Sequence, residues 1–159
     1  MAIHRFYWLI DHALAGCSQP GGAASDPEAL EDDLQWLRSR GIGAVLSLTE
    51  TPLAQEALDR YELPALHLPI TDQTAPSPEQ FVRALGFIDG QQAEGRAVVV
   101  HCKVGQGRTA IILAAHLVRA GLTPQEALRC LRAICPGAVS APAQERALEA
   151  FAAHRDWIL

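Results

Sequence analysis

The sequence is short of positive charge and of long apolar runs. Lys103 is the only lysine among 159 residues, and the net charge is −5. A protein that binds nucleic acid presents a basic face, so this composition argues against a nucleic-acid partner. It also offers no basic patch for stable association with a membrane, and no apolar run approaches the ~20 residues of a membrane-spanning helix.

The cysteines do not form a paired framework, and the chain does not start with a signal-peptide pattern. There are four of them: Cys17, Cys102, Cys130 and Cys135. We therefore expect a reduced cytoplasmic protein. Hydrophobic residues at 49% and charged residues at 19% are typical of a globular chain, and the length suits one domain over residues 1–159.

Apolar periodicity and turn residues divide the chain into alternating strands and helices. Two capping signals are distinct: Ser77 and Gln80 open one helix, and Thr123 and Glu126 open another. This alternation predicts an α/β domain with a mainly parallel central sheet flanked by helices. The expected strands are 5–10, 13–17, 42–48, 65–70 and 98–100, and the expected helices are 27–40, 52–61, 78–94, 108–120, 124–135 and 143–154.

The most informative stretch runs from Val98 to Ala110 and reads V-V-V-H-C-K-V-G-Q-G-R-T-A. It predicts a buried strand, a glycine-bearing loop and the start of a helix. Backbone N–H groups in such a loop, together with the helix dipole, form a cradle for an anion. The predicted phosphate-binding residues are Lys103, Val104, Gly105, Gln106, Gly107 and Arg108.

The side chains of this stretch predict nucleophilic displacement at phosphorus. A cysteine beside cations at a helix N-terminus is favoured as a thiolate, so Cys102 is the expected nucleophile. The planar guanidinium of Arg108 would hold two phosphate oxygens. Thr109 would offer its hydroxyl to the sulfur, and His101 would orient the loop, with an ordinary histidine at a strand end as the next interpretation of His101. This chemistry needs neither a metal nor a cofactor.

The stretch resembles the H-C-x-x-G-x-x-R-[ST] signature of the cysteine-dependent protein phosphatases. Four further segments resemble small dual-specificity phosphatases in order and spacing, which implies their fold from about Trp8 to the last helix. They are W-L-I-D-H-A-L-A-G-C-S-Q-P, A-V-L-S-L-T-E, H-L-P-I-T-D and C-P-G-A-V-S-A-P-A-Q-E. One departure is Ala110, where the family often has glycine.

The resemblance implies two further catalytic residues. Asp72 matches the family's general acid, although by itself it reads as a loop aspartate. Gln144 matches a glutamine that helps to position the hydrolytic water, although by itself it reads as an exposed residue of a first helical turn. Cys17 could trap an oxidised Cys102 as a disulfide, but a simple buried thiol is the favoured interpretation.

Several functions remain open from the sequence. A protein tyrosine or dual-specificity phosphatase acting on phosphorylated proteins or peptides comes first. A phosphatase for phosphoinositides or other small phosphoesters comes second, because Lys103 directly follows Cys102, although Gln106 stands where such enzymes carry another basic residue. A phosphate-reading binding module or a rhodanese-type sulfurtransferase would not need Cys102 and Asp72 together.

Overall fold

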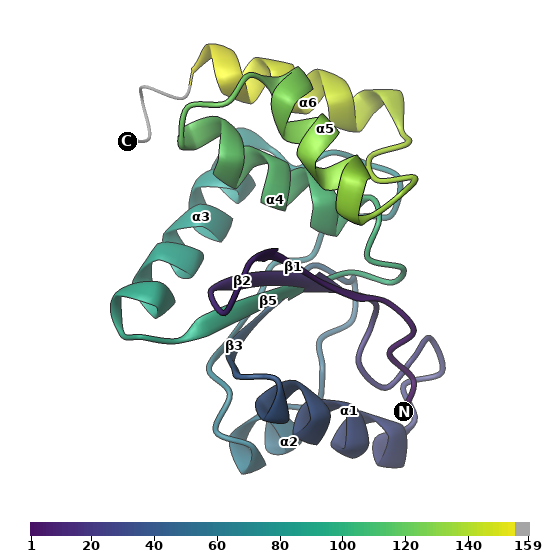
Figure 1. Ribbon diagram of the computed structural model, residues 1–159. Helices are drawn as coiled ribbons and strands as arrows, with labels where there is room; N and C mark the ends of the chain where they lie inside the picture. The colour runs from purple at the N-terminus through teal and green to yellow at the C-terminus, as the bar shows by residue number, and fades with distance from the viewer. Residues whose placement is uncertain (155–159) are drawn as a thin grey trace.

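The computed structural model describes residues 1–154 and is built on one five-stranded sheet (Figure 1). The strand order is β1-β2-β5-β3-β4, and only the β1–β2 pair is antiparallel. The predicted mainly parallel sheet is therefore confirmed. The strands are β1 (Phe6–Ile10), β2 (Leu14–Cys17), β3 (Ile42–Ser47), β4 (Ala65–His67) and β5 (Ala97–His101).

Helices cover both faces of the sheet. Helices α1 (Pro27–Ser39) and α2 (Gln55–Arg60) lie below it in Figure 1, and the other four lie above it. These four are α3 (Pro78–Ala93), α4 (Arg108–Arg119), α5 (Pro124–Ile134) and α6 (Pro142–Ala153). Helix α4 packs against β2 and β5, and α5 and α6 pack on α4. Within residues 1–154, no helix is long and apolar enough to cross a bilayer.

Strand β5 separates two hydrophobic cores by simple alternation. Val98 and Val100 point into the core beneath α3 to α6, whereas Val99 points into the core beneath α1 and α2. Side chains of a strand alternate between faces, so a run of valines is what a strand buried on both sides requires. This central strand leads directly to Cys102.

Most predicted boundaries are confirmed. The capping boxes at Ser77 and Thr123 are both formed. The predicted helix 52–61 was too long, because Thr49 Oγ1 donates to the carbonyl of Thr51 and the chain turns before α2 begins. The predicted strand 65–70 ends earlier, at His67, although the N–H groups of Leu68 and Ile70 still donate to the carbonyls of Ser47 in β3 and of Leu48 after it. The predicted domain extends to residue 159, and residues 155–159 lie outside the described part.

The parallel strands bring three loops to one edge of the sheet. The chain leaves β5 at Cys102, β3 before Thr49 and Glu50, and β4 before Asp72. In open α/β sheets, ligands bind outside the carboxyl ends of the strands. The candidate site residues therefore meet at the position where this architecture places a ligand.

A buried carboxylate fixes a fourth loop beside this edge. Asp33 on α1 is fully buried and accepts hydrogen bonds from the backbone N–H groups of Ala2, Ile3 and Gly21. Gly21 belongs to the β2–α1 loop. A buried charge is tolerated when hydrogen bonds replace its water shell, and these three donors do so. Asp33 thus holds the β2–α1 loop and the N-terminal segment against α1.

Replacing Asp33 by alanine should destabilise the fold. Three backbone N–H groups lose their acceptor, and we expect the free energy of unfolding to fall by about 1–3 kcal/mol. Urea unfolding followed by circular dichroism measures this change. The exposed neighbour Asp32 provides the matched control, since Asp32→Ala should change stability by only about 0.5 kcal/mol. Equal losses for the two variants would contradict the role of Asp33.

Candidate active site

The loop between β5 and α4, residues 102–107, forms the predicted cradle around Cys102. The cysteine is buried, and the N–H of Gly105 donates to its Sγ at 3.2 Å. Three loop carbonyls accept hydrogen bonds from groups outside the loop. These bonds join Lys103 O to Gln19 N, Val104 O to Arg5 Nη1 and Gly105 O to Tyr7 Oη.

Gln106 belongs to the cradle through its backbone only. Its side-chain amide donates to the carbonyl of Pro136 at 2.8 Å, and its own carbonyl accepts from Val139 N–H at 2.8 Å. Both bonds attach the loop to the α5–α6 connection. The side chain of Gln106 therefore supports the loop from outside and does not line the pocket.

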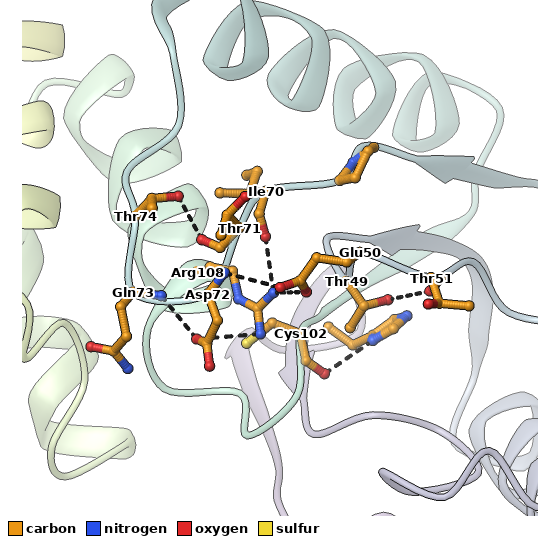
Figure 2. A network of polar contacts seen from close by, with 12 residues as sticks. Thr49, Glu50, Thr51, Ile70, Thr71, Asp72, Gln73, Thr74, Cys102 and Arg108 are labelled. Carbon is orange, nitrogen blue, oxygen red and sulfur yellow. Dashed lines mark hydrogen bonds and ion pairs between the residues drawn. The ribbon is translucent and has the colours of Figure 1, made fainter.

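Arg108 is the most completely enclosed charge of the site, with 2% of its surface exposed. Its Nη1 lies 2.7 Å from Glu50 Oε1 and 2.9 Å from the carbonyl of Ile70. Its Nη2 lies 3.4 Å from Asp72 Oδ1. Its Nε has no hydrogen-bond partner within residues 1–154. Figure 2 shows Glu50, Asp72 and Cys102 gathered around this guanidinium.

Asp72 lies next to the guanidinium of Arg108 at the carboxyl edge of the sheet. It sits on the loop between β4 and α3, its carboxylate is half exposed, and it borders the same pocket as Arg108. Its backbone N–H donates to Glu50 Oε2 at 3.2 Å. The structure thus brings Asp72, from the β4–α3 loop, close to Arg108 and Cys102, from the β5–α4 loop and the start of α4 (Figure 2).

His101 is fully buried beneath the cradle. Its Nε2 lies 2.7 Å from Ser47 Oγ, and its Nδ1 lies 3.2 Å from the carbonyl of Cys102. Burial lowers the pKa of His101 to about 4, so the ring is neutral at physiological pH. These contacts link β3 to the start of the loop.

Thr109 and Gln144 are both buried next to the loop. The hydroxyl of Thr109 has no hydrogen-bond partner within residues 1–154, so the predicted contact with the sulfur is not formed here. Gln144, in the first turn of α6, donates to the carbonyl of Thr74 at 3.3 Å and lies against Gly107. The exposed position that its sequence context alone suggested is wrong, because the α5–α6 connection turns α6 towards the loop.

Cys17 is a buried free thiol at the end of β2, opposite His101 in the sheet. Burial raises the pKa of Cys17 well above its usual value, which keeps the thiol protonated. A protonated thiol is a poor partner for disulfide formation. The favoured interpretation of Cys17 as a simple core residue agrees with this environment.

The site opens into a cavity of about 230 Å³. Two cations and two carboxylates border it, so the entrance is not strongly basic. The remaining lining is polar or small, without an aromatic ring. The lining residues are Gln19, Ala23, Ser25, Thr49, Glu50, Thr51, Asp72, Lys103 and Arg108.

Glu50 is the site residue that the sequence analysis did not single out. It lies shortly after the end of β3, as Asp72 lies after the end of β4, whereas Cys102 directly follows β5. Its position in the sequence could have indicated it, because an acidic residue that follows a parallel strand lies at the same edge of the sheet as the phosphate loop. The Arg108 guanidinium lowers the pKa of the Glu50 carboxyl, which is therefore charged at neutral pH.

Comparison with known proteins identifies the family. A family model described as a DSP-PTPase phosphatase of polymorphic toxin systems matches residues 15–122. The chain belongs to this phosphatase family. The predicted relationship to small dual-specificity phosphatases is thereby confirmed.

Curated relatives of this DSP-PTPase chain include enzymes for lipid and for protein substrates. Phosphatidylglycerophosphate phosphatase PTPMT2 of Arabidopsis thaliana is 30% identical over 124 residues, which are 75% of this chain and 54% of that protein. Human dual specificity protein phosphatase 12 is 38% identical over 112 residues, 67% of this chain and 30% of that protein. The chain therefore spans about half the length of these relatives, or less.

Solved structures confirm the fold. Tk-PTP in its active form is 30% identical, with a TM-score of 0.78 over 91% of this chain and 96% of that chain. PTPMT1 in complex with PI(5)P is 20% identical, with a TM-score of 0.81 over 96% of this chain and 97% of that chain. At 20% identity, the similarity to PTPMT1 establishes a shared fold only.

Gly105 offers a test of the cradle. Its φ is +85°, and a Cβ there would lie 2.9 Å from the backbone carbonyl of Cys17, so Gly105→Ala must displace the loop. A displacement of about 1 Å costs roughly 100-fold in rate, and we expect a loss of kcat/KM of that order on p-nitrophenyl phosphate.

Gly95 is the matched control for that substitution. Its φ of +79° carries the same backbone strain, about 1–2 kcal/mol for alanine, but nothing lies within 4 Å of a Cβ. Gly95→Ala should lower the thermal midpoint while kcat/KM remains within twofold. Similar kinetic losses for the two variants would mean that backbone strain, and not the shape of the cradle, limits activity.

The neutral state of His101 predicts a pH dependence of stability. Its pKa is about 4 in the folded chain and near 6.5 when unfolded, so the unfolded chain binds the proton more readily between these values. The free energy of unfolding should therefore fall as pH drops from about 6.5 to 4, by on the order of 3 kcal/mol. Urea titrations across this range should show a smaller decline in His101→Gln. An equal decline in the two proteins would contradict the assignment.

Proposed function

We propose that this chain hydrolyses phosphomonoesters through a cysteinyl-phosphate on Cys102, and that its substrates are phosphorylated proteins or peptides. The observation that carries the proposal is the arrangement at the carboxyl edge of the sheet. Lys103, Arg108 and Asp72 line one small cavity, and Cys102, whose sulfur accepts from the N–H of Gly105, directly precedes Lys103 in the same loop. Arg108 and Lys103 supply the cationic donors that the oxygens of a phosphate ester require there.

The proposed first step transfers the phosphoryl group to sulfur. The Cys102 thiolate attacks phosphorus, an S–P bond forms, and the bond to the leaving-group oxygen breaks. Asp72 donates its proton to that oxygen, so a poor leaving group departs as an alcohol or phenol. Arg108 and the loop N–H groups bind the equatorial oxygens throughout, which stabilises the charge of the transition state.

The proposed second step regenerates the enzyme. Water attacks phosphorus, Asp72 as a carboxylate takes the proton from the water, and the S–P bond breaks to release phosphate and the Cys102 thiolate. Gln144 is buried between the loop and Thr74, where its unpartnered side-chain oxygen could hold that water. Thr109 would stabilise the departing thiolate through its buried hydroxyl.

The charges around the cavity favour a singly phosphorylated substrate on a protein. Lys103 and Arg108 are the cations that border the cavity, and Glu50 and Asp72 balance them. A phosphorylated side chain brings one phosphate, which this donor set can satisfy. A headgroup with several phosphates would need further cations, and Lys103 is the only lysine of the chain. A cytoplasmic location stays a prediction.

A lipid phosphate is the second candidate. The relative PTPMT2 is a phosphatidylglycerophosphate phosphatase, and the structural neighbour PTPMT1 was solved with PI(5)P. Lys103 could contact an additional phosphate or glycerol oxygen at the entrance of the cavity. A lipid substrate would make Lys103 more important than it would be for a phosphopeptide.

A turnover panel distinguishes the two substrate classes. With a chelator present, wild type and Cys102→Ser are compared on p-nitrophenyl phosphate, phosphotyrosine, phosphoserine and phosphothreonine peptides, phosphoinositides and phosphatidylglycerophosphate. We expect turnover that favours phosphopeptides and disappears in Cys102→Ser, with inhibition by vanadate in wild type. Turnover restricted to lipids, with a large loss in Lys103→Ala, would establish the second candidate. Oxyanion binding without any turnover would indicate a phosphate-reading module.

A further inference from the structure

Two consecutive carbonyls of the phosphate loop are held by side chains from the first strand. Arg5 Nη1 donates to the carbonyl of Val104 at 2.8 Å, and Tyr7 Oη donates to the carbonyl of Gly105 at 2.7 Å. Arg5 directly precedes β1, and Tyr7 lies within it. The loop carbonyls on either side of this pair accept from backbone N–H groups instead. The two central peptide groups therefore depend on which side chains stand 99 and 98 residues earlier in the chain.

The ring of Tyr7 reaches the loop across β2, at a place where β2 has no side chain. Tyr7 pairs with Gly16, and a Cβ at Gly16 would lie 2.6 Å from Cζ of the ring. A glycine within a strand often marks such a close approach. Cys135 Sγ also lies 3.8 Å from the carbonyl of Gly105, but a thiol is a weak donor. The hydroxyl of Tyr7 is therefore the main support of this carbonyl.

A peptide group that is held by its carbonyl is held by its N–H as well. All peptide bonds in residues 1–154 are trans, so the carbonyl and the N–H across each bond point in opposite directions. The first of the two peptide groups demonstrates the consequence. Its carbonyl, from Val104, points to Arg5, and its N–H, from Gly105, donates to Cys102 Sγ at 3.2 Å. Tyr7 holds the next carbonyl from the same face of the strand, because residues two apart share a face.

We propose that Arg5 and Tyr7 are positioning residues for the phosphate loop. They hold two consecutive carbonyls towards β1 and so turn the following N–H groups, those of Gly105 and Gln106, towards the sulfur and the bound oxyanion. Neither Arg5 nor Tyr7 lines the cavity, so neither needs to touch substrate. The assignment rests on the proposed phosphoester hydrolysis, and it does not depend on whether the substrate is a protein or a lipid.

The loop needs this external support because its own backbone is permissive. Gly105 has a φ of +85°, and glycine adopts positive and negative φ with similar ease. A peptide group reversed at this point would present its oxygen where an oxyanion requires a donor. One reversal thus replaces an attraction by a repulsion, so the two hydrogen bonds from β1 control more than the stability of the loop.

The alternative is that Arg5 and Tyr7 stabilise the fold and nothing more. A purely structural role lowers the thermal midpoint and leaves oxyanion binding unchanged in the folded chain. A positioning role changes oxyanion binding and rate at temperatures well below the midpoint. The experiments below are therefore made where circular dichroism shows each variant to be fully folded.

The first experiment measures binding of tungstate, a phosphate mimic, by titration calorimetry, which needs no turnover. Tyr7→Phe removes one hydroxyl and keeps the ring over Gly16. We expect it to weaken tungstate binding by roughly 10-fold, as for the loss of one hydrogen bond to a charged group. The matched control is Tyr61→Phe at the end of α2, which packs in the opposite core and should bind like wild type. Unchanged binding in Tyr7→Phe, with or without a lower thermal midpoint, would overturn the proposal.

The second experiment assigns each side chain to its own peptide group. Tungstate should shift the amide resonances of Gly105 and Gln106 in the ¹⁵N–¹H spectrum of wild type. Tyr7→Phe should mainly reduce the shift of Gln106, and Arg5→Met should mainly reduce that of Gly105. The control for the lost charge is Arg129→Met, on an exposed residue of α5, which should leave both shifts unchanged. Equal reductions of both shifts in the two β1 variants would contradict the proposed coupling.

A double-variant cycle tests whether Tyr7 acts on catalysis through the loop. Tyr7→Phe should lower kcat/KM on p-nitrophenyl phosphate by roughly 10-fold in the wild-type background. In a Gly105→Ala background the loop is already displaced, so Tyr7→Phe should add less than about a twofold loss. Independent, multiplicative losses would contradict action through this peptide group.

These measurements separate the two proposals. Weaker tungstate binding in Tyr7→Phe, together with no turnover of any phosphoester by wild type, would refute the proposed function and support the positioning role. Cys102-dependent turnover with unaltered tungstate binding in Tyr7→Phe would support the function and refute the role of Tyr7. Failure of wild type to bind tungstate would refute both.

Discussion

The arrangement of the site depends on a guanidinium held almost out of contact with water. Arg108 begins α4, where the helix dipole disfavours a cation, and it is 2% exposed. Such a charge persists only with partners, and it has them in Glu50, the Ile70 carbonyl and Asp72. The loops after β3 and β4 are therefore positioned by the same cation that the proposed reaction uses to bind phosphate.

The parallel sheet makes this arrangement possible. Strands β3, β4 and β5 run in one direction, so the residues that follow them meet without long connections. Valines that alternate between two cores fix β5 at the centre, and the neutral ring of His101 ties its end to Ser47 on β3. Rigid strands thus carry irregular loops, and the loops carry the reactive groups.

The sequence predicted the features that local patterns encode. Capping residues predicted where helices start, and β-branched runs predicted the strands. The spacing of Cys102 and Arg108 indicated the phosphate loop. The sequence did not predict that Glu50 belongs to the site or that Gln144 is buried, because both features depend on how distant segments pack. The buried hydrogen bonds of Asp33 could not be predicted for the same reason, since its three backbone donors come from residues distant in the sequence. The end of α2 nearest the site was also mispredicted, because a side-chain hydrogen bond from Thr49 overrides helix propensity there.

The most direct test of the account is detection of the covalent intermediate. The enzyme is mixed with radiolabelled p-nitrophenyl phosphate, quenched in acid within one turnover and digested, and the labelled peptide is identified by mass spectrometry. The account predicts phosphate on the sulfur of Cys102 in wild type and no label in Cys102→Ser. Turnover without a labelled thiol, or a label on a different residue, would contradict it.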